Sequence, residues 1–181
     1  MHNVDTHTGP SFPFSDRLAR GAWNLAWLVL FRPSPVFMHG WRRWILRRFG
    51  AKVGVGAHIY PSARIWAPWN LDVDVEAGVA GGAILYSQGR IRIGRRAVVS
   101  QGAHICTGTH DYEKAGSPLV TGPVEIGDHA WVAAEAFVHP GVSIGDGAVV
   151  GARSVVTRDM PSWTVCAGHP CSPLKPREWR P

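Results

Sequence analysis

Three short segments of the chain carry side chains that could bind or react. They are Trp69 with Asn70, Ser87 with Gln88, and the stretch from Thr107 to Pro123, which contains His110 followed by Asp111. Imidazole has an unperturbed pKa near neutrality, so it can exchange a proton with a substrate. Short amide and hydroxyl side chains can hydrogen-bond to a polar ligand. These segments form a candidate active site, provided that the fold brings them together.

The pattern that must position these segments is a hexapeptide repeat. Ile or Val recurs every six residues without a miss at Ile126, Val132, Val138, Ile144, Val150 and Val156. The residue two places before each is small or β-branched, and Gly often follows it. An α-helix would repeat near every 3.6 residues and a strand every second residue, so neither fits. The spacing is typical of a parallel β-helix.

The same spacing continues upstream with interruptions. The earlier sets of three are Val53, Ile59 and Ile65; Val73, Val79 and Leu85; and Ile93, Val99 and Ile105. Three hexads make one turn of a triangular prism, so fifteen hexads predict about five coils. Against 18 residues per coil, the chain carries insertions of 2, 2 and 15 residues. Each insertion follows the third hexad of its coil, so all three segments should stack along one edge.

Composition limits the class of protein. The 181 residues suit one domain, and a net charge of +6 favours anionic partners. The basic residues match no nucleic-acid-binding motif, so we expect no nucleic-acid partner and leave open a phosphate or acidic-lipid contact. Three Cys without a CxxC pair, and no evident secretion signal, favour reduced thiols in the cytoplasm. We therefore expect a cytoplasmic protein, with a peripheral position at the inner membrane surface as a further option.

The chain divides into four predicted parts. We expect a disordered or extended N-terminus over 1–14, a helical cap over 15–50, the β-helix over 51–161 with a loop at 107–123, and a tail over 162–181. Within the cap, prolines separate two apolar stretches, and Trp lies among Arg in the second. Two compatible interpretations are helices that cover the open edge of the first coil, and membrane contact through residues 18–49.

The 107–123 insertion resembles a known loop. The run Thr107-Gly108-Thr109-His110-Asp111-Tyr112, followed by Pro118-Leu119 and Val124-Glu125-Ile126-Gly127-Asp128, is similar to the loop of hexapeptide-repeat acetyltransferases. The nearest branch comprises colanic acid biosynthesis, nodulation-factor and maltose or galactoside acetyltransferases. Other matching stretches include Phe31-Arg32-Pro33-Ser34-Pro35, Pro68-Trp69-Asn70-Leu71 and Trp163-Thr164-Val165. The likeness covers nearly the whole chain from about residue 20.

This resemblance implies a left-handed parallel β-helix, a homotrimer with active sites between subunits, and acetyl transfer from acetyl-CoA to a sugar hydroxyl. His110 matches the family's catalytic His and is the expected general base. Asp111 could orient its ring, or a backbone carbonyl could do so instead. A backbone N–H should stabilise the oxyanion, and no metal is expected. Serine or chloramphenicol acceptors are less favoured because the distinguishing extensions of those families are missing.

For the sugar, the resemblance points to Asn70, Ser87 and Gln88 on the predicted edge. Relatives carry Asn where this chain has Ser87, which leaves the identity of the acceptor sugar open. Ser87 could equally be a turn residue.

For coenzyme A, the matching positions lie in the C-terminal coils and tail: Trp131, Ala134, Ala152, Thr157, Arg158 and Lys175. Trp131 matches the aromatic residue near the thioester arm, or fills a groove between subunits. The two alanines would leave room for pantetheine, and Arg158 and Lys175 could pair with phosphates. The alternative is that these charged side chains are solvated and bind no phosphate.

Two other classes of function fit a β-helix. A zinc lyase of the γ-carbonic anhydrase type would need three converging imidazoles, for which His104, His110 and His129 could be offered, although their spacing does not resemble that family. A non-catalytic scaffold would keep the trimer without the chemistry, but the intact His110-Asp111 loop argues against it.

Overall fold

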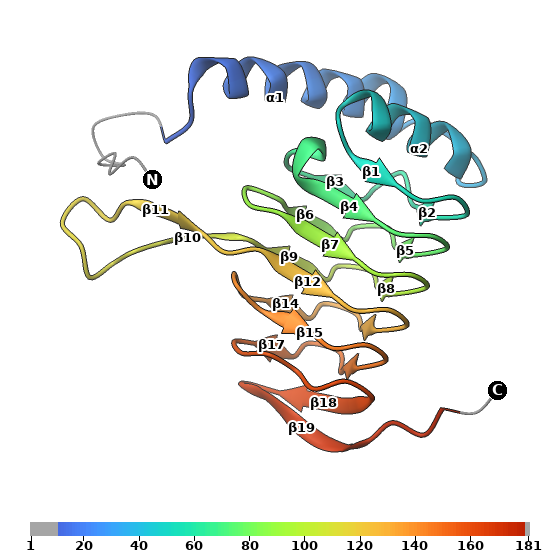
Figure 1. Cartoon of the computed structure of the whole chain (residues 1–181). Coiled ribbons are helices and arrows are strands. Elements are labelled where there is room, and N and C mark those ends of the chain that lie inside the picture. Colours follow the sequence, from blue (N-terminus) through green and yellow to red (C-terminus); the bar gives the residue numbers. More distant parts are fainter. Residues whose placement is uncertain (1–10, 180–181) are drawn as a thin grey trace.

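A computed structural model describes residues 11–179. Most of the predicted N-terminal extension, residues 1–10, therefore lies outside the described residues, as do 180–181. The chain forms a left-handed parallel β-helix with helices at its N-terminal end and an antiparallel hairpin that projects from one edge (Figure 1). None of the described helices has the length and apolar character needed to cross a bilayer.

Short strands stack into three sheets, one on each face of the prism. Sheet A contains β1 (Lys52–Val53), β4 (Leu71–Val73), β7 (Ile91–Ile93), β12 (Val124–Ile126) and β15 (Ser143–Ile144). Sheet B contains β2 (His58–Ile59), β5 (Gly78–Val79), β8 (Val98–Val99), β13 (Trp131–Val132), β16 (Val149–Val150), β18 (Thr164–Gly168) and β19 (Cys171–Pro176). Sheet C contains β3 (Arg64–Ile65), β6 (Ile84–Tyr86), β9 (His104–Cys106), β14 (Phe137–Val138) and β17 (Val155–Val156).

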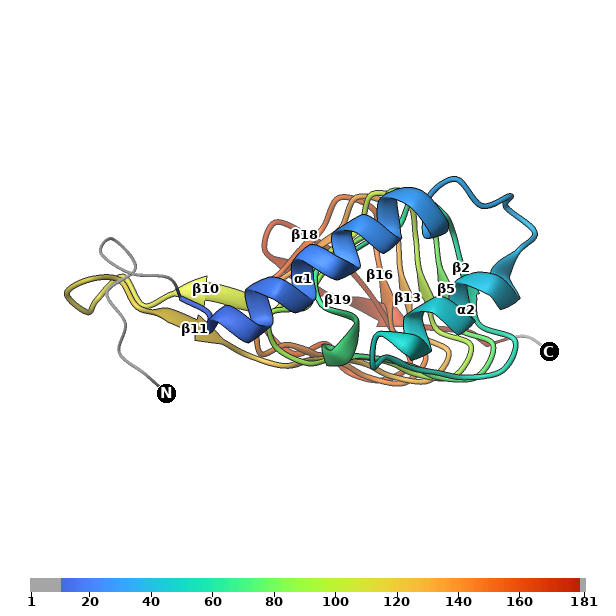
Figure 2. The same cartoon turned by 90° about the horizontal axis from the view of Figure 1, so that it is seen from above.

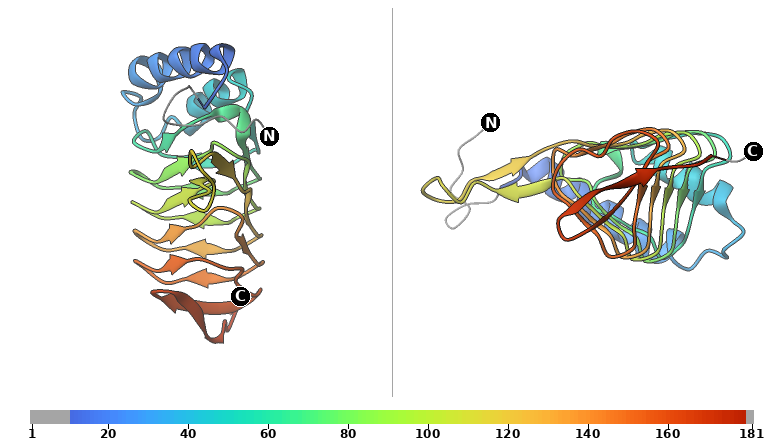
Figure 3. Two further views of the ribbon diagram at one scale, coloured as in Figure 1. Left: turned by 90° about the vertical axis from the view of Figure 1, so that its left-hand side faces the viewer. Right: turned by 90° about the horizontal axis from the view of Figure 1, so that it is seen from below.

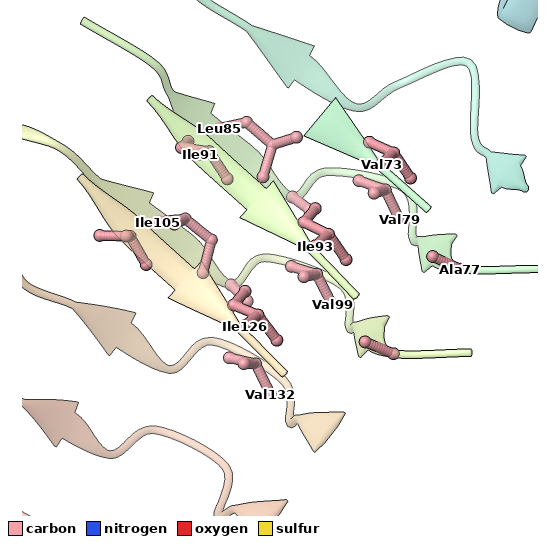
Figure 4. Close-up of a cluster of buried hydrophobic side chains, with 14 of the residues drawn as sticks. Val73, Ala77, Val79, Leu85, Ile91, Ile93, Val99, Ile105, Ile126 and Val132 are labelled. Atoms are coloured by element: carbon pink, nitrogen blue, oxygen red, sulfur yellow. The ribbon is translucent and has the colours of Figure 1, made fainter. Parts of the chain in front are cut away.

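The hexad residues fill the interior. All fifteen predicted positions are buried, none more than 7% exposed, and equivalent residues of successive coils are paired in parallel register. Figure 4 shows some of these side chains, such as Val79, Val99 and Val132, stacked inside the prism. Alanines of the preceding turns, such as Ala77, Ala83 and Ala97, are fully buried beside them. The alternation of one large and one small inward residue explains the repeat, because a narrow prism has room for no more.

The coil count differs slightly from the prediction. Five complete coils are followed by part of a sixth, in which Met160 bridges to Ile144 and Cys166 pairs with Val150. These two residues follow their partners by 16 residues rather than 18, so the shortened coil breaks the six-residue spacing. The tail therefore continues the β-helix before β19 folds back against β18 (Figure 3).

Helices lie over the first coil. They are α1 (Phe14–Ala26), the π-helical turn η1 (Trp27–Phe31) and α2 (His39–Arg48). Hydrogen bonds between neighbouring coils run in both directions, as from Gly54 N to Val73 O at 2.7 Å and from Glu76 N to Val55 O at 3.0 Å. Alternate residues of a strand face opposite neighbours. Half of the first-coil carbonyls therefore face the open edge, where no strand follows to donate to them.

Side chains of the helices supply the donors that the first coil lacks. The indole N–H groups of Trp23 and Trp27 donate to Ile65 O and Ala63 O, at 2.7 and 2.9 Å. The first-coil carbonyls of Ile59, Ala57 and Val53 accept hydrogen bonds from Arg42, Arg43 and Arg47, in that order. Trp23 is fully buried and packs its ring edge-on against Phe31 and Phe49. The helices thus complete the hydrogen bonding of the open sheet edges.

Candidate active site on the projecting arm

The three inserted segments leave the prism at the same corner, between sheets C and A. They are the 3-10 turn η2 (Pro68–Asn70), the Ser87–Gln88 step after β6, and the arm that follows β9. Hydrogen bonds join neighbouring segments along this corner. The Asn70 amide donates to the carbonyls of Ser87 and Gln88, at 3.0 and 2.9 Å, and Gly89 N donates to Thr107 Oγ1 at 2.8 Å. The segments therefore stack as the spacing of the repeats predicts.

The arm is a two-stranded antiparallel hairpin of β10 (Gly108–His110) and β11 (Leu119–Thr121). Its base is closed by Gly122 N donating to Thr107 O at 3.0 Å. Figures 1 and 2 both show the arm extending well away from the prism. Its tip is fixed by Asp111 N donating to Pro118 O at 3.0 Å.

His110 lies at the end of β10 with its side chain exposed. Its Nδ1 is 2.7 Å from the backbone carbonyl oxygen of Ser117. A carbonyl can only accept, so Nδ1 carries the hydrogen in this contact and Nε2 presents its lone pair. A fixed ring with a free Nε2 is the arrangement that a general base requires.

Asp111 does not orient that ring. Its carboxylate forms an ion pair with Lys114, with Oδ2 3.0 Å from Nζ. This hydrogen bond to Lys114 lowers the pKa of Asp111. Of the two orienting groups expected from the sequence, the structure supports the backbone carbonyl. The sequence carried no signal for Ser117 because any residue supplies a carbonyl.

The three residues predicted to bind sugar have different environments. Ser87 is fully buried, and its hydroxyl accepts from Ala67 N and donates to Ala67 O, both at 3.0 Å. Ser87 therefore holds the corner, which fits the alternative interpretation of a turn residue, and its contact with a sugar stays a prediction. Asn70 is half-buried and lines a hollow with Trp69 and Arg90.

Gln88 is the least satisfied of the three. Its Nε2 donates to the Tyr86 hydroxyl at 2.9 Å, and its Oε1 is buried without a hydrogen-bond partner among the described residues. Burial raises the pKa of Tyr86. Gln88 therefore has hydrogen-bonding capacity left at the base of the arm.

The positions matched to coenzyme A lie on one face and at two corners of the prism. Trp131 and Lys175 lie in one outward row of sheet B, linked through Val149 and Val165. Ala134 and Ala152 follow sheet B at its corner with sheet C, whereas Thr157 and Arg158 follow β17 at the corner that carries the arm. Arg158 donates to Ser172 Oγ at 3.0 Å, and the Trp131 indole donates to Ser100 Oγ at 2.8 Å. Trp131 and Lys175 therefore lie on a different face of the prism from the corner that carries the arm.

The three histidines considered for zinc also lie apart. His104 packs between the rings of Tyr86 and Phe137, His110 is on the arm, and His129 contacts Trp179. Within residues 11–179 no three His, Cys, Asp or Glu side chains form a group that could hold a metal ion.

The sequence of the chain matches one family model and is similar to that of a named acetyltransferase. The family model "Bacterial transferase hexapeptide (six repeats)" matches residues 123–158. The chain is 41% identical over 155 residues to the Escherichia coli K12 protein named "Putative colanic acid biosynthesis acetyltransferase WcaF", covering 86% of this chain and 85% of the relative.

Solved structures share the fold. A maltose O-acetyltransferase from Clostridium difficile 630 superposes with a TM-score of 0.83 at 29% identity, over 92% of this chain and 90% of that one. A hexapeptide-repeat acetyltransferase from Vibrio cholerae O1 biovar eltor, complexed with acetyl coenzyme A, gives a TM-score of 0.78 at 21% identity, over 91% and 88%. The chain belongs to the hexapeptide-repeat acetyltransferases.

Proposed function

We propose that the protein transfers an acetyl group from acetyl-CoA to a sugar hydroxyl of an exopolysaccharide or related glycan precursor, with His110 as general base. The observation that carries the proposal is the His110 ring, held by the Ser117 carbonyl with Nε2 free on an exposed arm. The name of the Escherichia coli relative specifies colanic acid biosynthesis, and that of the Clostridium neighbour specifies a maltose acceptor. Acetyl coenzyme A is bound in the Vibrio neighbour.

The chemistry follows from the state of the imidazole. A sugar hydroxyl is a poor nucleophile near neutral pH, so Nε2 removes its proton while the oxygen attacks the thioester carbonyl. The new C–O bond gives a tetrahedral oxyanion, which a backbone N–H must stabilise. Collapse breaks the C–S bond, and the imidazolium returns its proton to the departing sulfur. The Ser117 carbonyl stabilises the imidazolium throughout because Nδ1–H continues to donate to it.

We further propose that the site is shared between the subunits of a homotrimer. The arm carries His110 away from its own prism, and Trp131 and Lys175 lie on a different face of that prism. An arm that reaches a neighbouring subunit would bring His110 to that subunit's coenzyme A. We assign the reaction to the cytoplasm, where the three cysteines, free and buried in the structure, would stay reduced.

The test is acetyl-CoA consumption with a panel of sugar acceptors, for the wild type and His110→Ala. We expect His110→Ala to lower kcat by about 10²–10⁴-fold, the usual contribution of a general base. Tyr112→Phe is the matched control, because Tyr112 is an exposed neighbour on the same arm and the change keeps its size. Equal rates in wild type and His110→Ala would refute the proposal, and no sugar-dependent turnover in either would favour a scaffold.

A further inference from the structure

The net charge of this protein is concentrated at one end of the prism. Residues 11–50 contain seven Arg, one Asp and no Lys or Glu, which gives +6, the formal net charge of the whole chain. Residues 51–179 contain eleven basic and eleven acidic residues and therefore add nothing. The single acidic residue of the helical end, Asp16, is paired with Arg20 at 3.0 Å.

Exposed apolar side chains are concentrated at the same end. Ten of the nineteen large apolar residues that are exposed in the described chain fall there: Phe14, Leu18, Leu25, Leu28, Val29, Leu30, Val36, Phe37, Met38 and Trp44. In α1, Trp23 and Ala26 face the coils and are buried, while Phe14, Leu18 and Leu25 follow the opposite side at helical spacing. We call the outer surface of residues 14–48 the helical face; Figure 2 looks down on it.

The loop between η1 and α2 presents one of these side chains on a backbone that is tied to the prism. Arg42 is fully buried, although it is charged, and donates to the carbonyls of Pro35 and Val36 and to Ser34 Oγ. The same guanidinium donates to Ile59 O on the first coil. The loop is thereby tied to the prism, and yet Phe37, next to the tied residues, is 82% exposed. Because the backbone beside Phe37 is already ordered, insertion of this side chain into another environment costs little further loop entropy.

The arginines of this end serve two different roles. Arg42, Arg43 and Arg47 donate to carbonyls of the first coil. Arg17, Arg32 and Arg48 are exposed and make no such bond. Arg32 and Arg48 instead lie over the rings of Trp27 and Trp44, with centroid distances of 5.4 and 5.1 Å. Trp44 also stacks on Trp41 at 5.1 Å. Trp and Arg side by side, beside exposed Leu and Phe, are typical of helices that lie in a membrane interface.

We propose that the helical face docks on an anionic lipid surface, with α1 and α2 lying in the interface. The exposed arginines would contact lipid headgroups, and Leu18, Leu25 and Phe37 would enter the acyl boundary. Charge complementarity selects this occupant, because the positive excess of the molecule lies at the end that also exposes its apolar side chains, and Arg17, Arg32 and Arg48 are exposed there. This inference is independent of the proposed acetyl transfer.

The experiment is flotation of the full-length protein with vesicles of phosphatidylcholine alone or with phosphatidylglycerol added. We expect binding to the anionic vesicles, falling with salt as surface electrostatics are screened. Arg17→Gln/Arg32→Gln/Arg48→Gln should weaken it at least tenfold, since each basic residue near a charged leaflet contributes several-fold. The matched control is Arg92→Gln/Arg95→Gln/Arg153→Gln, which removes the same charge from the coils and should float like the wild type.

A second pair of variants tests the apolar part. Leu25→Ser/Phe37→Ser should lose vesicle binding, while Leu174→Ser, on the exposed surface of β19, should keep it. Unchanged thermal unfolding would show that each variant is folded. Equal loss in both arginine triples, or equal binding to neutral vesicles, would overturn the proposal. Absence of binding together with an altered oligomeric state of Leu25→Ser/Phe37→Ser would assign the face to contacts between copies instead.

Discussion

The imidazole of His110 owes its tautomer to one backbone oxygen, and the adjacent carboxylate takes no part in this. A sequence that reads His-Asp suggests a charge-stabilised base, but successive side chains in a strand point to opposite sides. In the structure Asp111 pairs with Lys114 at the tip of the arm, while the Ser117 carbonyl, two residues before β11, accepts from Nδ1. The sequence predicts His110 as the base and leaves the orienting group open between Asp111 and a backbone carbonyl, because the choice depends on how the arm folds.

A substitution at Asp111 tests this assignment. Asp111→Asn should change kcat by less than about tenfold, because it removes the Lys114 ion pair and leaves the imidazole contact intact. His110→Ala should cost far more, in the range given by loss of a general base. Steady-state kinetics on both variants with one acceptor would decide. If Asp111→Asn proved as damaging as His110→Ala, the carboxylate would have a catalytic role that this geometry does not give it.

The environment of His104 leads to a separate prediction about the stability of the fold at acidic pH. Its Nε2 is buried without a partner in the described structure, its ring packs 4.9 Å from that of Phe137, and burial lowers its pKa below 6.5. As the pH falls below 6.5, His104 therefore binds a proton more readily in the unfolded chain than in the folded chain. The stability contribution is complete above pH 6.5 and is lost as pH falls toward the folded pKa.

His104→Phe should remove this part of the pH dependence while it keeps the aromatic packing. Denaturant midpoints measured near pH 7.5 and near pH 5.5 should differ less for the variant than for the wild type. His129→Phe is the matched control, because it makes the same change of side chain at another half-buried ring and leaves His104 in place. An identical drop in midpoint for His104→Phe and wild type would contradict the assignment.

At the scale of elements, the hexapeptide pattern predicted the interior because each sixth residue must fill the same narrow prism. The glycines that follow it have a physical cause as well. A Cβ at Gly127 would lie 2.6 Å from Asp146 N, and one at Gly94 or Gly145 would come similarly close to the next coil. These positions favour Gly because an added Cβ would clash with the backbone of the next coil.

A pair of glycine substitutions separates this effect from backbone entropy. Gly127→Ala should destabilise the protein by about 1–3 kcal/mol through overpacking. Gly21→Ala, on α1, meets no atom within 4 Å and should stabilise it by about 0.5–1 kcal/mol. Unfolding in guanidinium would measure both. The explanation fails if the two changes have the same sign.

The sequence did not predict the features that depend on contacts between segments rather than on the six-residue repeat. The partial sixth coil was missed because Met160 and Cys166 replace Ile or Val at a shortened spacing. The helical segment was expected from its apolar runs. That its Trp and Arg side chains donate to first-coil carbonyls depends on directions that no periodicity specifies.

At the scale of the whole molecule, we propose a site that is shared between chains. Trp131 and Lys175 lie in one row of sheet B, and the arm leaves the prism at the corner between sheets C and A. Sequence could place each residue on its coil. It could not show which face of a neighbour the arm would meet, because that depends on packing between subunits.

Subunit mixing tests the shared site. His110→Ala and the double variant Trp131→Ala/Lys175→Ala should each be nearly inactive. After random exchange in equal amounts, about one quarter of the sites would combine an intact arm with an intact coenzyme A surface, because each comes from a different subunit. Activity should recover to that fraction. Exchange verified by mass labelling without any recovery would show that arm and surface act within one chain.

The most direct measurement is a structure of the assembled protein with coenzyme A. The account predicts that the thiol of coenzyme A bound to one subunit lies within about 6 Å of His110 Nε2 of an adjacent subunit. This distance leaves room for one sugar hydroxyl between the imidazole and the thioester carbonyl. A thiol bound far from the His110 of every subunit in the assembly would contradict it.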